Sequence, residues 1–177
     1  MKYYISDSHF GHENIIRLCN RPFNSVKEMD EVMIDRWNSV VNKNDEVYIL
    51  GDLNFRSNTS GADYLRRLNG RKFIITGNHD NVTPEMRNLC EWVKTYAEVR
   101  DGNKRIVLFH YPIIEWNGFF RGTLHFYGHI HNSFENDAYK IMRDVHNAYN
   151  VGADILDFTP RTADEVIHFN QIYNNTH

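Results

Sequence analysis

Five short apolar runs in this sequence each end directly in a polar cluster that contains Asp, Asn or His. The runs cover residues 2–6, 46–50, 72–76, 105–109 and 124–127. Short, continuous apolar runs are typical of strands that are buried on both faces of a sheet. Ligand sites of α/β proteins lie beyond the carboxyl ends of such strands, so we expect these clusters to converge at one edge of the fold.

Helical patterns separate the apolar runs. Ser25-Val26-Lys27-Glu28 is a capping-box sequence and predicts a helix that reaches about Val40. Thr83-Pro84-Glu85 predicts a second helix, with Thr as the N-cap and Pro at the first helical position. Further helices are expected over 60–68 and after the capping box at 162–165, and further strands over 92–100 and 148–157. This alternation predicts an α/β fold with a mixed sheet or two packed sheets.

The composition indicates one globular domain spanning residues 1–177. Hydrophobic residues make up 41% and aromatic residues 14%, which exceeds what disordered chains contain. No apolar run is long enough to span a bilayer, and the first residues lack the apolar core of a signal peptide. We therefore expect a cytoplasmic protein with no membrane partner.

Charge and cysteine content exclude two further classes. The net charge of −3 argues against strong binding to duplex nucleic acid, which needs a basic face. The two cysteines, Cys19 and Cys90, cannot form a disulfide framework or a Cys-rich zinc site. The sequence carries no indication of an oligomeric state.

The polar clusters contain the residue types of a metal site. They read Asp7-Ser8-His9, Gly51-Asp52, Gly77-Asn78-His79-Asp80, His110 and Gly128-His129-Ile130-His131. Each cluster alone also suits a structural role, such as a polar turn or a histidine at the rim of a core. Five of them in a row, each at the end of a predicted strand, favour a joint chemical role. Carboxylate, imidazole and amide donors without thiolate suit Mn, Fe, Ni or Zn, and there are enough donors for two ions.

In this order and spacing the clusters resemble the motifs of the calcineurin-like metallophosphoesterase superfamily, most of all its small single-domain bacterial and phage members. The resemblance runs from Lys2 to His131, and Asn150 to Asp154 with Pro160 resemble the family's closing strand and turn. It implies an α/β, four-layer sandwich with two packed mixed β-sheets flanked by helices. The metal site is then expected at the carboxyl ends of the strands.

The resemblance also implies a role for each motif residue. Asp7, His9 and His131 are expected to bind one divalent ion, Asn78, His110 and His129 a second, and Asp52 is expected to bridge the two. A water held between the ions would be the nucleophile, His79 the general acid, and Asp80 the residue that orients the His79 ring. Two ions about 3.5–4 Å apart suit in-line displacement at phosphorus. The expected reaction is hydrolysis of a small phosphodiester or nucleotide-like substrate, with diesters preferred to monoesters.

The second motif departs from the family pattern. The family often has Gly-Asp-x-x-Asp, whereas this chain has Gly51-Asp52-Leu53-Asn54-Phe55, so the second Asp is replaced. The third motif ends in Asp80 where protein phosphatases of the superfamily usually have Glu. Those phosphatases also usually have Asp-Arg-Gly where this chain has Phe55-Arg56-Ser57, and these two differences from them make a phosphoprotein substrate less favoured.

Three further residues are candidates for substrate binding. Arg56 follows the second motif and could meet a phosphate, since Arg favours bidentate phosphate contacts. His12 follows the first motif, and Arg121 belongs to the aromatic loop 111–121, which could stack a base. The alternatives are an exposed loop charge for Arg56, a solvent-exposed helix start for His12, and a loop that packs on the core or on another subunit.

The alternative function is a catalytically lapsed member of the fold that acts as a protein-binding scaffold. Such a protein would be expected to have lost His79 or some of the metal ligands, and here none is missing. The sequence contains neither a phosphate-binding Gly-x-x-x-x-Gly-Lys-Ser/Thr loop nor the His-Glu-x-x-His pattern of zinc peptidases. Both absences favour a phosphoesterase over a nucleotide-dependent phosphotransferase or a zinc peptidase.

Overall fold

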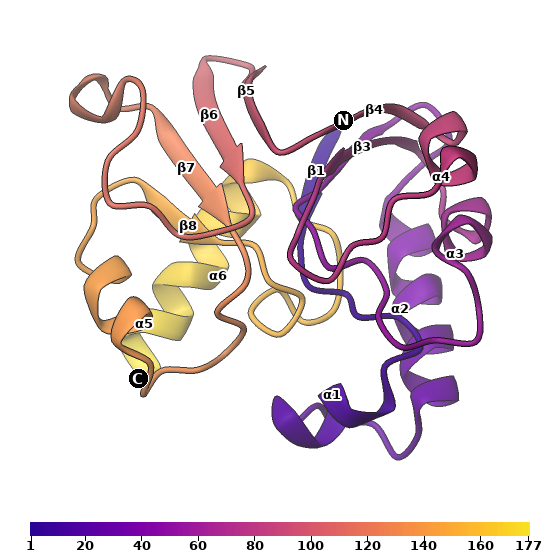
Figure 1. Ribbon diagram of the computed structural model, residues 1–177. Helices are drawn as coiled ribbons and strands as arrows, with labels where there is room; N and C mark the ends of the chain where they lie inside the picture. Colours follow the sequence, from indigo (N-terminus) through magenta and orange to yellow (C-terminus); the bar gives the residue numbers. More distant parts are fainter.

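Two four-stranded sheets form the centre of the computed structural model, which describes residues 1–177 (Figure 1). The first sheet has the order β1-β2-β3-β4, and all of its strands run parallel: Lys2–Ile5, Glu46–Ile49, Arg71–Ile75 and Cys90–Lys94. The second has the order β5-β6-β7-β8, with β5 antiparallel to its neighbour: Tyr96–Asp101, Lys104–Phe109, Leu124–Tyr127 and Ala148–Asn150. The predicted α/β sandwich of two packed sheets is confirmed. The first sheet, however, is parallel rather than mixed, because at least one helix connects each pair of its consecutive strands.

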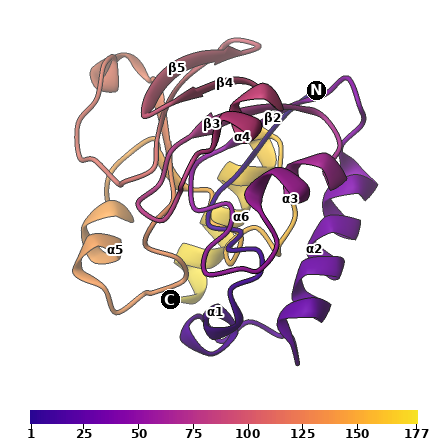
Figure 2. The ribbon, with the colours of Figure 1, turned by 45° about the vertical axis from the view of Figure 1, so that its right-hand side comes forward.

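Helices cover the outer faces of the two sheets (Figures 1 and 2). On the first sheet these are α2 (Val26–Val40), α3 (Gly61–Arg67) and α4 (Pro84–Asn88), and on the second α5 (Asp137–Met142) and α6 (Ala163–Thr176). The remaining helices are the short α1 (Glu13–Leu18) and the 3-10 helix η1 (Phe119–Arg121). The predicted caps are confirmed: Ser25 and Thr83 each accept a hydrogen bond from a backbone N–H of the first turn, and Thr162 forms a capping box with Glu165.

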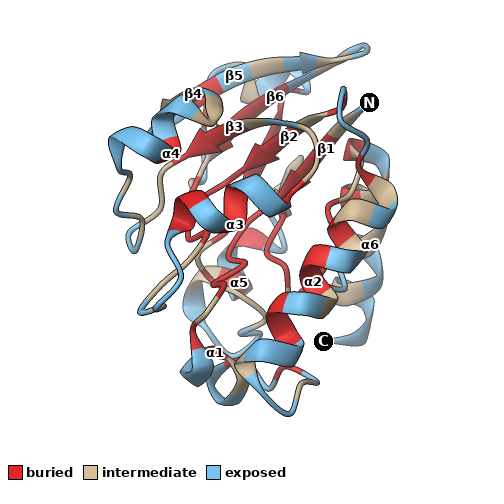
Figure 3. Ribbon diagram, turned by 90° about the vertical axis from the view of Figure 1, so that its right-hand side faces the viewer, coloured by how far each residue is buried: buried red, intermediate tan, exposed pale blue.

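Strand alternation divides the interior into two main cores. In β1, Tyr3 and Ile5 pack toward α2, where Met33 and Trp37 are buried. Tyr4 faces the other way and joins an aromatic layer between the sheets, with its ring 5.3 Å from Tyr48 and 4.9 Å from Phe126. Figure 3 shows the buried strands of the first sheet beneath helices whose outward faces are exposed. This double burial explains why the strands read as continuous apolar runs.

Two of the predicted strands are wrong in extent. Segment 92–100 is not one strand: β4 ends at Lys94, the chain bends at Thr95, and β5 continues in the other sheet. Segment 148–157 is a strand only as far as Asn150, because the chain then makes one isolated bridge from Gly152 to Ser6 and enters a turn. The short helices α1 and α5 were not among the sequence-based predictions.

The segments that follow β1 and β2 lie side by side, as do those that follow β6 and β7. The backbone N–H of Asp7 donates to the carbonyl of Gly51 at 3.0 Å, and that of Gly128 donates to the carbonyl of His110 at 2.9 Å. The Ser6–Gly152 bridge joins the two sheets at the same edge. The predicted convergence of the strand ends is therefore confirmed. None of the helices is both long enough and apolar enough to cross a bilayer.

Candidate metal centre

All seven predicted metal ligands lie at this shared edge, and both sheets contribute. Asp7 and His9 follow β1, Asp52 follows β2, Asn78 follows β3, His110 follows β6, and His129 and His131 follow β7. Neither sheet alone holds the complete donor set.

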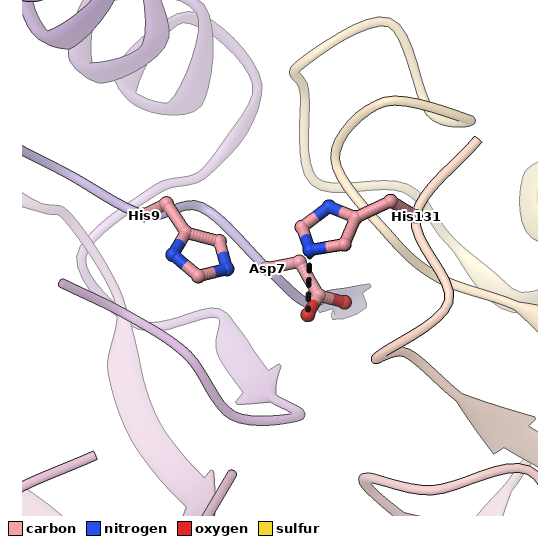
Figure 4. Close-up of side chains that lie close together, drawn as sticks. All are labelled: Asp7, His9 and His131. Carbon is pink, nitrogen blue, oxygen red and sulfur yellow. Dashed lines mark ion pairs between the residues drawn. The ribbon is translucent and has the colours of Figure 1, made fainter. Parts of the chain in front are cut away.

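The first group of donors consists of Asp7, His9 and His131 (Figure 4). One ligand atom of each lies within 4.8 Å of the other two, and Oδ1 of Asp7 is 3.9 Å from Nε2 of His131. Asp7 and His9 are buried, yet Oδ1 of Asp7 and both ring nitrogens of His9 have no hydrogen-bonding partner. Buried polar atoms are almost always satisfied in proteins, so these orphaned donor atoms fit a bound cation.

The second group consists of Asn78, His110 and His129. Oδ1 of Asn78 lies 3.0 Å from Nε2 of His110 and 2.9 Å from Nδ1 of His129. One amide oxygen and two imidazole nitrogens therefore face a common point. This is the donor set that the sequence predicts for the second ion.

Asp52 lies between the two groups. Its Oδ2 is 3.6 Å from Nε2 of His9 and 3.6 Å from Nε2 of His110. Its Oδ1 accepts a hydrogen bond of 2.9 Å from the backbone N–H of His79. Burial, together with the nearby carboxylates of Asp7 and Asp80, raises the pKa of Asp52.

Contacts behind the imidazoles direct their free nitrogens into the site. Nδ1 of His110 lies 2.7 Å from the carbonyl of Leu50, and Nδ1 of His131 lies 2.9 Å from Oδ2 of Asp154. A ring that donates from Nδ1 presents the lone pair of Nε2 to a metal. Burial lowers the pKa of His9 to about 2, so that its ring is neutral, as ligation requires.

His131 differs from His9 in its charge. Burial opposes a charge on its ring, but the hydrogen bond to Asp154 and the nearby Cys19 and Asp7 outweigh burial and raise the pKa of His131 to about 11. A cation bound at Nε2 would have to displace that proton. The carboxylate of Asp154 then increases the basicity of the ligand.

Sequence reasoning did not identify the Arg21–Asp154 pair. The guanidinium donates from Nε to Oδ1 of Asp154 at 2.8 Å and from Nη2 to Oδ2 at 3.2 Å. It also donates to the carbonyl of Ser8 at 2.8 Å and to that of Asp7 at 2.7 Å. Both side chains are almost fully buried. The signal in the sequence was the position of Asp154 in the segment from Asn150 to Asp154 that resembles the family's closing strand and turn.

The backbone at the site is strained. Five of the seven predicted ligands have a positive φ: Asp7 at 55°, His9 at 52°, Asp52 at 53°, His129 at 72° and His131 at 50°. Left-handed conformations are uncommon for residues other than glycine and cost on the order of 1–3 kcal/mol each. Such outliers cluster at functional sites, so their concentration here supports a functional role for this edge.

Two motif glycines are required by close approach. A Cβ atom on Gly77 would lie 2.2 Å from Oδ1 of Asp52, and one on Gly128 would lie 2.0 Å from Oγ of Ser6 and 2.3 Å from Oδ2 of Asp7. The space that these glycines leave open is filled by the ligands of the neighbouring strands.

The predicted role of Asp80 is wrong. Both of its carboxylate oxygens accept backbone hydrogen bonds: Oδ2 from Gly77 at 2.8 Å and Asp52 at 2.9 Å, and Oδ1 from Leu53 at 3.0 Å. Asp80 therefore ties the second motif to the third and does not orient the ring of His79. The His79 ring is exposed, lies 5.6 Å from that of His9, and forms no hydrogen bond within the chain.

The three candidate substrate residues are placed differently. His12 is buried rather than solvent-exposed; its ring is 5.5 Å from that of His9, and burial lowers its pKa. Arg56 is exposed, with its guanidinium 5.1 Å from the ring of Phe55. Arg121 lines a surface cavity with Lys104 and other residues at the amino ends of β6 and β7. The prediction for Arg121 is wrong, because the loop returns it to the edge opposite the metal ligands.

The aromatic loop begins at the site and then leaves it. The ring of Tyr111 lies 5.0 Å from that of His110 and 4.7 Å from that of His129. Trp116 is buried and donates from Nε1 to the carbonyl of Thr123 at 2.8 Å. Only the start of the loop therefore borders the metal ligands.

Comparison with known proteins finds relatives along nearly the whole chain. No family model matches it. Protein MJ1445 of Methanocaldococcus jannaschii is 33% identical over 167 residues, which cover 93% of this chain and 88% of that protein. The gene 66 protein of Mycobacterium phage L5 is 28% identical, and the aligned region covers 81% of this chain and 84% of the phage protein. The crystal structure of AQ665 from Aquifex aeolicus, a protein of unknown function, superposes with a TM-score of 0.74 at 27% identity and covers 95% of this chain and 98% of its own.

Proposed function

The chain belongs to one protein family with MJ1445 of Methanocaldococcus jannaschii and has the fold of the calcineurin-like metallophosphoesterases, and from this premise we propose that it is a metal-dependent hydrolase of phosphate esters. One observation carries the proposal. A single carboxylate oxygen of Asp52 lies 3.6 Å from an imidazole nitrogen of each donor group. A carboxylate shared in this way is suited to holding two cations close together.

The residues would divide into two ligand sets joined by Asp52. Asp7, His9 and His131 would hold one divalent ion, and Asn78, His110 and His129 the other. When bound, such a pair of ions neutralises the charge of a phosphate ester and lowers the pKa of a water molecule. Oxygen and nitrogen donors without thiolate favour Mn, Fe, Ni or Zn over softer ions.

His79 would donate the proton that the leaving oxygen requires. Its ring is exposed beside the ligands and has no hydrogen-bonding partner in the chain, so its N–H groups are free to reach a substrate. Its backbone N–H is bound to Asp52, which keeps its main chain beside the bridging carboxylate. Positioned proton donors contribute roughly 10²–10⁴-fold to rate.

The substrate proposed is a small phosphodiester or a nucleotide-like ester. Among the exposed side chains beside the ligands, His79 and Tyr111 offer hydrogen-bonding groups, and Arg56 offers one guanidinium over the ring of Phe55. A diester carries one negative charge, whereas a monoester carries close to two and needs more cationic groups around it. The Tyr111 ring beside His129 offers an aromatic edge to a base or aryl group.

A substrate screen tests this function. The protein, stripped of metal and reloaded separately with Mn, Fe, Ni or Zn, is assayed against bis(p-nitrophenyl) phosphate, p-nitrophenyl phosphate, nucleotides and cyclic dinucleotides. We expect metal-dependent hydrolysis that is faster for diesters than for monoesters and is abolished by EDTA. A faster monoester reaction would overturn the diester preference. Absence of hydrolysis with every metal and every ester would overturn the proposed function itself.

A further inference from the structure

The ring of Phe55 lies among three imidazoles of the site. Its centroid is 4.1 Å from that of His79, 5.0 Å from that of His12 and 6.4 Å from that of His9. We propose that Phe55 is the positioning residue of His79 and holds the imidazole in the orientation from which it reaches the leaving group. This inference rests on the proposed function and assigns it one further residue.

His79 needs such a partner, because its ring is otherwise held weakly. The main chain is fixed by the hydrogen bond from its N–H to Asp52, but no side chain or carbonyl binds either ring nitrogen. The carboxylate of the adjacent Asp80 is fully engaged with backbone N–H groups. An exposed side chain without contacts changes rotamer within picoseconds to nanoseconds, whereas a proton donor must be held within about 0.5 Å of its working position.

Phe55 itself is held from both sides. The residue before it, Asn54, forms a bridge with Phe10, whose N–H donates to the carbonyl of Leu53 at 2.9 Å. The residue after it, Arg56, has a φ of 48° and places its guanidinium 5.1 Å from the Phe55 ring. The buried His12 meets the ring at an interplanar angle of 87°, an edge contact that aromatic pairs favour. The ring is therefore a rigid surface for its neighbours.

The chemistry of the contact suits a proton donor. The planes of Phe55 and His79 are inclined by 38°, so the imidazole leans on an apolar face. A carboxylate in this position would accept a hydrogen bond from the ring and occupy one of its N–H groups. An apolar ring restricts the rotamer and leaves both nitrogens free for the substrate. Phe55 stands where the second motif of the family often has Asp, so in this chain ring packing takes over the positioning of His79.

A double-mutant cycle tests the proposal with two diesters that differ only in their leaving group. One releases p-nitrophenolate, which hardly needs a proton, and the other releases an alkoxide, which does. We expect Phe55→Ala to lower kcat about 10–100-fold on the alkyl ester, the range associated with misplacement of a catalytic group by about 1 Å. The loss on the nitrophenyl ester should be several-fold smaller. Added to His79→Ala, Phe55→Ala should cause no further loss, because the ring it positions is gone.

Two further measurements separate positioning from general damage. Metal content by elemental analysis should match the wild type, and ¹³C relaxation of the His79 ring in the metal-free protein should show greater mobility in Phe55→Ala. Phe55→Tyr, which keeps the ring, should restore both rate and rigidity. Phe169→Ala is the matched control, since Phe169 is also half-buried but lies on helix α6 with its ring against the guanidinium of Arg161. It should leave the ratio of the two rates unchanged.

The outcomes distinguish this inference from the function on which it rests. If the wild-type protein hydrolyses neither ester, the proposed function fails. If the wild type is active and the effects of Phe55→Ala and His79→Ala are additive, or Phe55→Ala slows both esters equally, the positioning role is wrong and the function stands. If His79→Ala changes neither rate, His79 is not the proton donor and the role of Phe55 fails with it.

Discussion

Asp52 couples the two donor groups, because one of its oxygens faces an imidazole from each group. Its position depends on the geometry after β2, where the carboxylate is buried, the backbone φ is 53° and Oδ1 is bound to the N–H of His79. Two cations held near each other repel strongly in a site of low dielectric constant. For the proposed pair of ions, the negative charge of Asp52 would therefore matter more than its shape.

Asp52→Asn tests this charge. The amide has almost the same shape, so we expect the fold to persist while the protein loses at least one of two bound ions and nearly all activity. The measurements are elemental analysis after metal loading and the rate on a diester. Asp144→Asn, at an exposed carboxylate, is the matched control and should change neither. Full metal content with wild-type turnover in Asp52→Asn would rule out a bridging role.

Gly77→Ala tests the close approach between the second and third motifs. The new Cβ would lie 2.2 Å from Oδ1 and 2.7 Å from the backbone nitrogen of Asp52, so the strand end must shift. We expect metal affinity to fall by about 10–100-fold, as for loss of contacts that orient metal ligands. Gly102→Ala is the control: it has no atom within 4 Å but has a φ of 58°, so it should lower stability by about 1–2 kcal/mol without affecting metal affinity. Calorimetric titration with Mn measures the metal affinity of both variants. An affinity of Gly77→Ala equal to that of Gly102→Ala would contradict this account.

The residues of the site differ in how well the sequence reveals them. The convergence of the seven predicted ligands could be inferred from the sequence, because each lies within four residues of the end of an apolar strand. Arg21 was not, because it acts through contacts with Asp154 and two carbonyls that only the folded chain brings together. Asp80 was assigned the wrong partner for the same reason: motif spacing cannot distinguish a ring nitrogen from the three backbone N–H groups that it binds.

Among the elements, the segment after α1 is joined to the end of β1 and to the turn after β8 through one buried ion pair. Arg21 binds both oxygens of Asp154 and the carbonyls of Asp7 and Ser8. Four hydrogen bonds to oxygen atoms therefore meet at one guanidinium directly behind the predicted ligand His131. The guanidinium lowers the pKa of Asp154 against the opposing effect of burial, which keeps the carboxylate ionised.

Arg21→Met should destabilise the metal-free protein by about 3–5 kcal/mol, because it removes the guanidinium from the buried Asp154 carboxylate and takes the donor away from the carbonyls of Asp7 and Ser8. Combining it with Asp154→Asn should recover part of that loss. Arg36→Met is the matched control; its pair with Asp157 is exposed and should contribute at most about 1 kcal/mol. Urea unfolding gives the free energy of unfolding of the wild type and the three variants. A loss in Arg21→Met no larger than in the control would show that the pair contributes little to stability.

The extent of the elements was predictable where local chemistry decides it. The helix after Ser25 and the strand over 124–127 have the expected bounds because a cap or a change in polarity marks their ends. The break at Thr95 was not predictable, since residues on both sides continue a strand-like pattern and only packing assigns them to different sheets. The helices α1 and α5 have six residues each, too few for a clear periodicity.

At the scale of the whole molecule, the donor set spans the interface between the two sheets. Four of the ligands follow strands of the first sheet and three follow strands of the second. Bound cations would therefore add a connection between two layers that also meet through the core between the sheets, the Ser6–Gly152 bridge and the Arg21–Asp154 pair. Metal binding should stabilise the entire fold rather than one loop.

Metal removal tests this connection. A ligand present at 100 times its Kd stabilises the folded state by about 2.7 kcal/mol, which for a chain of this size corresponds to a shift in Tm of about 5–10 °C. We expect EDTA to lower the Tm of the Mn-loaded protein by that amount and to increase hydrogen exchange in both sheets. Asp52→Asn should show a much smaller shift. An unchanged Tm, or protection lost in one sheet only, would contradict a role for the metals between the layers.

The left-handed backbone at five ligand positions bears on how such a protein changes over generations. Glycine or asparagine would relieve the conformational strain at any of these positions, so a lineage freed from the need for metal would gain stability by accepting either residue there. Mutation and selection for folding would then erode the motif first at these positions. This chain still has Asp or His at all five. Under the proposed function, selection for metal binding would have to act against this gain in stability at each of the five positions.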